Sequence, residues 1–331
     1  MMNFYKILFT STLMSGTIIS ISSMTWFTAW MGLEINLLSI MPLMKNLNNK
    51  YCAESSIKYF IIQAMSSMMF LFSIILFLNY QKQWEIFSII INSSLMMKIG
   101  AAPFHTWLPE VISGMNWNMN FIILTWQKIA PMILMSYNMM PTLFFCIIII
   151  LSSIFSIQGL NQTCMRKILA YSSINHISWL ISSLMNSLSI WLYYFLIYSL
   201  INFNIIIMLK KFNSYNFNQL YKLINFNKNM KLFFMMNFLS LGGLPPFLGF
   251  FPKWIIINYL IYNKMILISM LLIIFSLIPL YFYLRLTFSS LSINSKESLI
   301  KKYKKISFMN FLMSMTTIFG LIFCVMMMEF L

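Results

Sequence analysis

The sequence predicts an all-α polytopic membrane protein with about eleven transmembrane helices. Of its 331 residues, 60% are hydrophobic and only 8% are charged, whereas soluble domains carry about 25% charged residues. Lysine and arginine number 22 against 6 acidic residues, which gives a net charge of +16. The basic residues are scattered between apolar runs and form no continuous basic face, so we predict no nucleic-acid partner. The partner that this composition predicts is the lipid bilayer.

Apolar runs of transmembrane length follow one another along nearly the whole chain. A helix needs about 20 apolar residues to cross a hydrocarbon layer of about 30 Å. The run over 231–262 is longer and contains glycines and prolines, so we treat it as one interrupted span. The predicted spans are residues 4–22, 25–44, 55–79, 86–104, 120–138, 142–160, 167–185, 190–209, 231–262, 264–288 and 306–329.

The placement of the basic residues predicts the orientation. With these spans, 16 of the 22 lysines and arginines fall on the side of the N-terminus, and two, Lys82 and Lys264, fall on the other side. Loops rich in lysine and arginine face the cytoplasm or an equivalent compartment. We therefore expect the N-terminus on the matrix or cytoplasmic side and the C-terminus on the opposite side.

Four lysines lie inside predicted spans, namely Lys58, Lys98, Lys128 and Lys253. Lys58 is near the end of its span and four residues after Glu54, so it can reach the interface and form an i,i+4 ion pair. The other lysines lie deeper, where a charged group costs roughly 2.5–3.5 kcal/mol.

Glu34 is the acidic residue that lies near the middle of a span. A structural ion pair between Glu34 and one lysine is one interpretation, but it would leave the other buried lysines without a partner. Several buried cations around one carboxylate favour a proton relay, because a buried lysine readily exchanges its proton when a nearby carboxylate moves. We therefore predict a relay that includes Glu34, Lys98 and Lys128.

Two spans carry the same pattern of helix-breaking residues. Each pattern indicates either a functional break in the helix or only a kink that helix packing requires. Irregular backbone at membrane depth occurs only inside protein or beside a water-filled cavity. The two spans are the fourth and the ninth, so they cross the membrane in opposite directions, as in the inverted repeats of transporters. The patterns are Gly100-x-x-Pro103-Phe104-x-x-x-x-Pro109 and Gly243-x-x-Pro246-Phe247-x-x-x-x-Pro252.

This pattern predicts two inverted five-helix repeats, each with one broken helix, within a single transmembrane domain over residues 1–331. The first repeat covers about 4–138 and the second about 142–288, and an extra helix follows at about 306–329.

Lys253 and the two histidines complete the candidate relay. Lys253 directly follows Pro252, a residue suited to the first turn of a helix, where the helix dipole disfavours a charged lysine. His105 and His176 are each either a relay member or a hydrogen-bonded interior residue.

No cofactor or metal site is predicted in this chain. The four cysteines lie far apart, without a CxxC pair or a histidine at ligand spacing. The sequence also lacks GxGxxG, P-loop and GxSxG motifs.

Five segments resemble the chain 2 family of mitochondrial NADH–ubiquinone oxidoreductase, an antiporter-like subunit of the membrane arm of respiratory complex I. The resemblance covers roughly residues 4–290. The segments are WMGLEINLLSI around Glu34, MKIGAAPFHTWLPE around Lys98, TWQKIAP around Lys128, QGLNQTCMRKILAYSSINHISW around His176 and NFLSLGGLPPFLGFFPKW ending near Lys253.

The resemblance implies a proton-translocating subunit of NADH:ubiquinone reductase in the mitochondrial inner membrane. Glu34 and Lys98 would be the coupling pair, Lys128 the central relay lysine and Lys253 the residue that leads to the exit. NADH, flavin, iron–sulfur clusters and ubiquinone would be bound by partner subunits. Other membrane-arm subunits and the bilayer, with cardiolipin as a candidate lipid, are the implied partners. The C-terminus would face the intermembrane space.

Two other functions remain open at this stage: a stand-alone cation/proton antiporter and a purely structural assembly subunit. A stand-alone carrier should move ions when it is reconstituted alone. A structural subunit should tolerate the loss of Lys128 or Glu34 without a loss of proton translocation.

Overall fold

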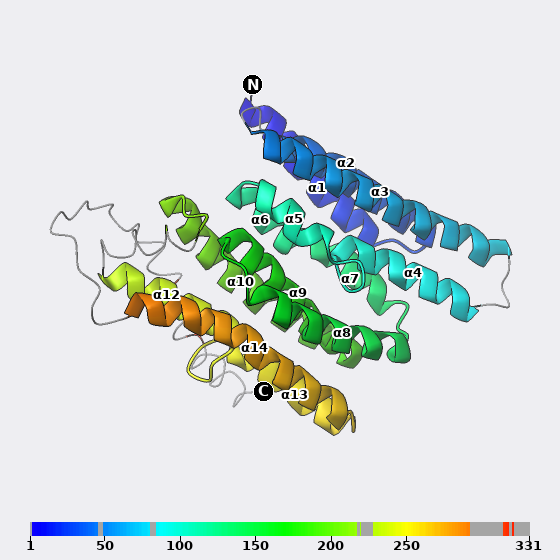
Figure 1. Ribbon diagram of the computed structural model, residues 1–331. Helices are drawn as coiled ribbons and strands as arrows, with labels where there is room; N and C mark the ends of the chain where they lie inside the picture. The colour runs from blue at the N-terminus through cyan, green and yellow to red at the C-terminus, as the bar shows by residue number, and fades with distance from the viewer. Residues whose placement is uncertain are drawn as a thin grey trace. The chain divides into compact units, whose positions relative to one another are not determined.

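The computed structural model describes residues 2–45, 49–79, 84–216, 219, 228–291, 314–317 and 320. These residues form α-helices and contain no β-strand, which confirms the all-α prediction (Figure 1). The helices are α1 (Met2–Ile21), α2 (Trp26–Met44), α3 (Lys50–Asn79), α4 (Trp84–Ile99), α5 (Trp107–Gly114), α6 (Trp117–Leu124), α7 (Trp126–Ser136), α8 (Pro141–Gly159), α9 (Met165–Asn186), α10 (Leu188–Phe212), α12 (Lys228–Gly242), α13 (Phe250–Tyr262) and α14 (Ile266–Leu291).

The first ten predicted spans each overlap one helix or a pair of shorter helices. The eleventh, 306–329, lies largely outside the described residues, of which 314–317 are helical. The number of eleven spans therefore stays a prediction. Within the predicted span 120–138 the helix is interrupted at Thr125, whereas Pro131 lies inside α7.

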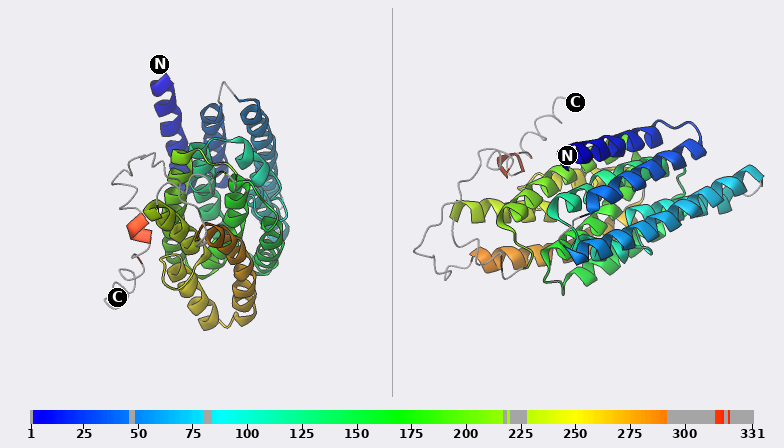
Figure 2. Two further views of the ribbon diagram at one scale, coloured as in Figure 1. Left: turned by 60° about the vertical axis from the view of Figure 1, so that its left-hand side comes forward. Right: turned by 90° about the horizontal axis from the view of Figure 1, so that it is seen from above.

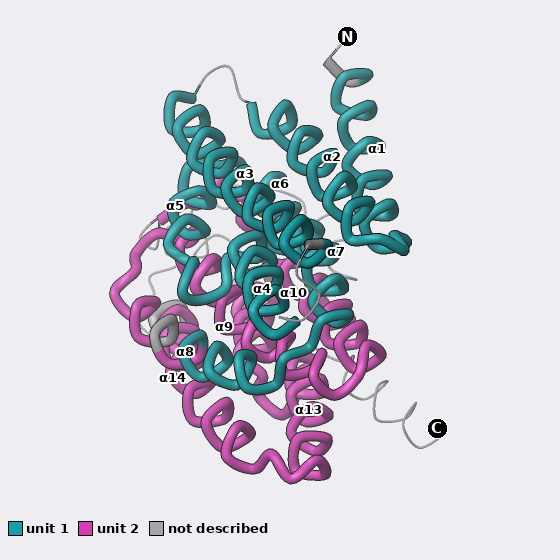
Figure 3. The backbone as a smooth tube through the Cα atoms, turned by 90° about the vertical axis from the view of Figure 1, so that its right-hand side faces the viewer, with its two compact units in different colours: residues 1–151 teal, residues 152–331 magenta. Residues whose placement is uncertain are grey.

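The chain divides into two compact units, residues 1–151 and 152–331 (Figure 3). The division falls inside α8, about ten residues after the predicted boundary between the two repeats. The prediction of a single transmembrane domain stays a prediction.

In the first unit, α1 and α2 form a closely packed helical hairpin (Figure 2). The chain turns between them at residues 22–25, and the Thr25 side chain caps α2 by accepting from the Thr28 backbone N–H. Gly16 of α1 and Gly32 of α2 face each other, because a Cβ added at Gly32 would lie 2.9 Å from the Gly16 carbonyl oxygen. Glycine thus lets the two backbones approach, as in other membrane helix pairs.

Replacing Gly32 with alanine should therefore force α1 and α2 apart. The added Cβ would lie 2.7 Å from the Ser20 backbone nitrogen, an atom that cannot move without the helix. We expect a destabilisation of about 1–3 kcal/mol, the usual cost of overpacking, measured as a lower thermal midpoint of the protein in its native membrane. Met31→Ala, at an exposed neighbouring position, serves as the control. Equal midpoints for the two variants would contradict the close packing.

A break separates α4 from α5 in the first unit. Helix α4 ends at Ile99, and Gly100 adopts φ +79°, a left-handed conformation that favours glycine. The Ala101 N–H donates to the Met96 carbonyl over 3.0 Å, and the Phe104 N–H donates to the Ala101 carbonyl over 2.9 Å. The backbone thus leaves the helix through a hydrogen-bonded cap and a turn.

The second unit contains the same break between α12 and α13. Gly243 adopts φ +81°, the Leu244 N–H donates to the Leu239 carbonyl over 3.4 Å, and the Phe247 N–H donates to the Leu244 carbonyl over 3.0 Å. Each of these positions lies 143 residues after its counterpart in the first unit, as do the end of the helix before the break and the start of the helix after it. The repeated sequence pattern therefore builds the same glycine cap and turn twice, although the Ala102–Pro103 peptide bond of the first break is cis and its counterpart in the second break is not.

Six described helices, α1, α2, α3, α8, α10 and α14, are long and apolar enough to cross a membrane. The described helices that carry Lys98, Lys128, His176 and Lys253 (α4, α7, α9 and α13) are not among these six, because they are shorter or more polar. The three buried lysines and His176 thus lie on helices less suited to face lipid.

Candidate functional site

Two of the predicted relay lysines are buried in the first unit. Lys98 lies in the last turn of α4, one residue before the break, and is 6% exposed. Lys128 lies in the first turn of α7, just after the interruption at Thr125, and is 1% exposed. Both lysines therefore adjoin irregular backbone, where carbonyl and N–H groups are freed from the helix.

Glu34 lies on α2 and is partly buried. Its carboxylate acts on Lys98 through a Coulombic interaction, although the two described side chains form no ion pair within 4.0 Å. The predicted coupling pair is thus within electrostatic reach but not in contact. In this arrangement a small movement of Glu34 changes the field at Lys98.

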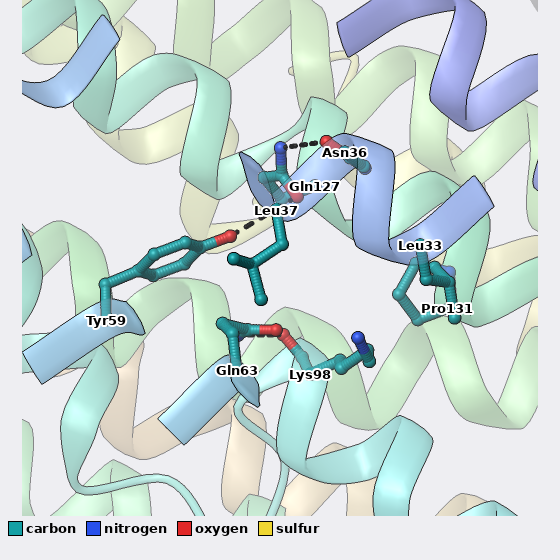
Figure 4. Close-up of a pocket in the computed structure, with 8 residues that line it drawn as sticks. All are labelled: Leu33, Asn36, Leu37, Tyr59, Gln63, Lys98, Gln127 and Pro131. Carbon is teal, nitrogen blue, oxygen red and sulfur yellow. Dashed lines mark hydrogen bonds between the residues drawn. The ribbon is translucent and has the colours of Figure 1, made fainter. Parts of the chain in front are cut away.

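A small polar cavity lies beside Lys98 (Figure 4). Asn36 of α2 and Gln127 of α7 are joined across it, because the Gln127 Nε2 donates to the Asn36 Oδ1 over 2.8 Å. The Tyr59 hydroxyl of α3 donates to the Gln127 Oε1 over 3.4 Å. The residues that line it are Leu33, Asn36, Leu37, Tyr59, Gln63, Lys98, Gln127 and Pro131.

Lys58 has a structural role, as predicted. Its Nζ lies 2.9 Å from the Glu54 Oε1, which confirms the i,i+4 pair, and 3.0 Å from the Glu110 Oε2. The three side chains are 43–61% exposed, so solvent screens these pairs. The contact with Glu110 ties α3 to α5 and was not predicted, because it joins residues far apart in sequence.

In the second unit, the Lys253 side chain spans the break between α12 and α13. It lies in the first turn of α13, and its Nζ donates to the Gly242 carbonyl at the end of α12 over 2.9 Å. The ammonium therefore meets the negative end of the α12 dipole, which stabilises a cation. The position of Lys253 after Pro252 indicates only the positive end of the α13 dipole, so this contact was not predictable from the sequence. The Nζ also lies 5.6 Å from the centre of the Trp179 ring, within range of a cation–π interaction.

His176 belongs to a hydrogen-bonded cluster of the second unit. Its Nδ1 lies 2.7 Å from the Tyr194 hydroxyl, and its ring lies 4.9 Å from that of Tyr198. The Tyr198 hydroxyl forms further hydrogen bonds with Ser173 and Asn202. A second small cavity is lined by His176, Tyr194, Tyr198, Ser240, Gly249 and Pro252, with apolar neighbours.

His105 lies in the break between α4 and α5, where its Nδ1 is 3.1 Å from the Pro103 carbonyl oxygen. It is partly exposed. Since α4 ends at Ile99, His105 does not continue the helical face of Lys98.

The predicted site residues thus form two local groups. Glu34 and Lys98 interact in the first unit, and Gln127, the residue before Lys128, lines the cavity beside Lys98. In the second unit, His176 lines a cavity together with Pro252, the residue before Lys253. Among the described residues, no three His, Cys, Asp or Glu side chains are grouped so that they could hold a metal ion.

Sequence reasoning missed the amides of Asn36, Gln63 and Gln127. A signal was present, because Gln127 adjoins Lys128 and Asn36 follows Glu34 by two residues. Amides did not stand out in the sequence, because burying an amide costs less free energy than burying a charge.

Comparison with known proteins identifies close relatives. Residues 23–279 match the family described as NADH:quinone oxidoreductase/Mrp antiporter, transmembrane region. The chain is 49% identical over 301 residues to NADH-ubiquinone oxidoreductase chain 2 of Locusta migratoria, covering 89% of this chain and 88% of the relative. It is 44% identical over 321 residues to the protein of the same name from Anopheles gambiae, covering 95% of this chain and 94% of the relative.

Solved structures share the fold at lower identity. A chain of respiratory complex I from Thermus thermophilus with bound aureothin matches with a TM-score of 0.82 and 20% identity, over 96% of this chain and 78% of that chain. A chain of the Mrp complex from Dietzia matches with a TM-score of 0.72 and 14% identity, over 84% of this chain and 59% of that chain.

Proposed function

Because the chain belongs to the NADH:quinone oxidoreductase/Mrp antiporter transmembrane family, among its NADH-ubiquinone oxidoreductase chain 2 members, we propose that it translocates protons as a membrane-arm subunit of respiratory complex I. Electron transfer from NADH to ubiquinone takes place in other subunits, which hold the flavin and the iron–sulfur clusters. This chain binds no cofactor of its own.

The observation that carries this proposal is the burial of three lysines beside helix breaks, with a carboxylate in electrostatic reach of one of them. Lys98, Lys128 and Lys253 are each at most 7% exposed. A buried lysine is costly unless it pairs or exchanges its proton. The Glu34 charge acts on Lys98, so a displacement of Glu34 changes the electrostatic field at Lys98.

In the proposed relay, Glu34 and Lys98 form the coupling pair and Lys128 is the central carrier. Lys253 passes the proton towards the exit. His176, bonded to Tyr194 beside the second cavity, is a further candidate carrier. His105 is the weakest candidate, because its ring bonds a carbonyl of its own loop.

The proposed architecture is two inverted repeats of five helices, followed by an extra helix, eleven in all. The matching glycine caps and turns of the two breaks support it. We place the protein in the mitochondrial inner membrane, with the N-terminus in the matrix and the C-terminus in the intermembrane space. Its partners are other membrane-arm subunits and the lipid bilayer, with cardiolipin as a candidate lipid.

The Glu34→Gln variant tests the coupling pair. Glutamine keeps the shape of the side chain and removes the charge that acts on Lys98, so the number of protons moved per electron should fall in the assembled complex. Glu85→Gln, at an exposed position in the first turn of α4, is the matched control and should leave the ratio unchanged. A wild-type ratio in the Glu34→Gln complex would show that the chain has a structural role only. Ion transport by the isolated, reconstituted chain would instead favour a stand-alone antiporter.

A further inference from the structure

The aromatic ring of Trp179 meets the ammonium of Lys253 inside the second unit. The Lys253 Nζ lies 5.6 Å from the centre of the ring, within the range of a cation–π interaction. Trp179 is 1% exposed and Lys253 is 7% exposed. Because both groups are enclosed by protein, solvent screens their attraction little, and a cation–π interaction is strongest when it is desolvated.

The described residues of the second unit contain no carboxylate that could balance the charge of Lys253. The acidic residues of this unit are Glu297 and Glu329, and both lie outside the described residues. The Gly242 carbonyl accepts from the Lys253 Nζ over 2.9 Å, but one carbonyl offsets only part of the cost of burying an ammonium. The face of Trp179 therefore supplies a second stabilising contact.

The helices packed against α13 are α9, α10 and α14, and they carry other titratable groups. Their buried titratable side chains are His176, Tyr194, Tyr198 and Tyr283. Their basic side chains are Arg166, Lys167, Lys210, Lys211 and Arg285. Within the described part of the chain, Lys253 forms neither a hydrogen bond nor an ion pair with any of these groups. The state of its ammonium therefore depends on the Gly242 carbonyl and the Trp179 ring.

The indole N–H of Trp179 indicates that the ring is kept for its face. The Trp179 Nε1 is buried, and none of the described residues accepts a hydrogen bond from it. An unpaired buried donor costs free energy, and phenylalanine or leucine would fill an apolar space without that cost. Tryptophan is also the strongest cation–π partner among the aromatic residues. The contact with Lys253 thus offsets the cost of the unpaired N–H.

Helix α9 places this ring beside the proposed relay. His176 and Trp179 are three residues apart on α9, so they lie on the same side of the helix. His176 lines a cavity to which Pro252 also contributes, and Lys253 follows Pro252 in the first turn of α13. One side of α9 therefore meets the start of α13 with a candidate carrier and with an aromatic ring.

From these contacts we propose that Trp179 is a positioning residue for Lys253, whose ring holds the ammonium across the break between α12 and α13 and stabilises its charged form. The inference rests on the proposed function, in which Lys253 passes the proton towards the exit. Trp179 itself exchanges no proton and forms no covalent bond.

Two variants of similar side-chain size separate the aromatic face from the volume of the ring. Trp179→Met and Trp179→Phe both leave space where the indole was, but only phenylalanine keeps a π face. In the intact complex, the neutral amine of Lys253 is labelled with a small acylating reagent and quantified by mass spectrometry. The labelling rate at neutral pH should rise about tenfold in Trp179→Met, because the charged form loses a partner, and stay near the wild-type rate in Trp179→Phe. An equal rise in both variants would overturn the proposal.

Trp191→Met is the matched control. Trp191 lies on α10 and is 4% exposed, and its Nε1 is also buried without an acceptor among the described residues. Its ring stacks on that of Phe195 over 5.4 Å. The control should therefore disturb packing to a similar extent and leave the labelling of Lys253 unchanged. If labelling rose as much as in Trp179→Met, loosened packing would explain the effect and the proposal would be wrong.

Fluorinated tryptophan keeps the test decisive if Trp179→Met fails to assemble. Fluorine withdraws electrons from the ring face and hardly changes its shape, so the ring attracts a cation less. A wild-type complex made with fluorinated tryptophan should show faster labelling of Lys253. The same treatment of the Trp179→Phe complex should not change the rate. Equal rates with and without fluorine in the wild type would contradict the role of Trp179.

The pH profile of proton translocation separates this inference from the proposed function. If Lys253 carries protons, the alkaline fall in protons moved per electron should begin about one pH unit lower in Trp179→Met. Faster labelling with an unchanged pH profile would support the role of Trp179 but remove Lys253 from the relay. Unchanged labelling would overturn the role of Trp179, whatever the profile.

Discussion

Replacing Lys128 with methionine should abolish proton translocation by this subunit while the complex still assembles. Lys128 is 1% exposed and lies in the first turn of α7, after the interruption at Thr125. Methionine has nearly the same length and flexibility, so the packing changes little, but it cannot bind a proton. The measurement is the number of protons moved per electron transferred from NADH to ubiquinone, in complexes that are assembled to equal amounts.

Lys6→Met is the matched control, because it makes the same chemical change at an exposed position of α1. It should leave the ratio unchanged. If Lys128→Met kept the full ratio, Lys128 would be a structural lysine and the central step of the proposed relay would be wrong.

Replacing Gly243 with alanine should reduce proton translocation about as much as Lys128→Met does, but by displacing Lys253. Gly243 has φ +81°, a conformation that costs other residues about 1–3 kcal/mol. The added Cβ would also lie 2.8 Å from the Lys253 Nζ. Lys253 must therefore move away from the Gly242 carbonyl, and we expect both less assembled complex and fewer protons per electron in the complex that remains.

The neighbouring glycine provides the control for this experiment. Gly242 ends α12, and a Cβ added there would find its nearest heavy atom, the Tyr283 Cδ2, at an ordinary 3.4 Å. Gly242→Ala keeps the carbonyl that accepts from Lys253, so it should cost little. If the two variants behaved alike in assembly and in translocation, the position of Lys253 across the break would not matter.

Helix breaks were predictable from the sequence because they depend on local chemistry. The double glycine and the prolines after it predict a break near Gly243, and α12 indeed ends at Gly242. The interruption beside Lys128 was not predictable, because no glycine or proline stands at Thr125, where the backbone is irregular, and Pro131 lies inside α7.

Contacts of the candidate site were not predictable, because they depend on how distant helices meet. Gln127 and Asn36 are 91 residues apart in sequence, and no pattern in either segment specifies the other. Lys253 illustrates the same limit. Its neighbour Pro252 indicates the start of a helix, whereas its hydrogen bond to Gly242 depends on the path of the chain through the break.

The separation between apolar helices and lysine-bearing helices has a consequence for biogenesis. The apolar helix α3 precedes α4, the shorter helix that carries the buried Lys98. A charged lysine within the bilayer opposes insertion, so α4 gains from entering the bilayer together with its apolar predecessor. Replacing Lys98 with an apolar residue would ease the insertion of α4 but would remove a carrier from the proposed relay. Insertion and the proposed proton transfer therefore favour opposite properties at this position.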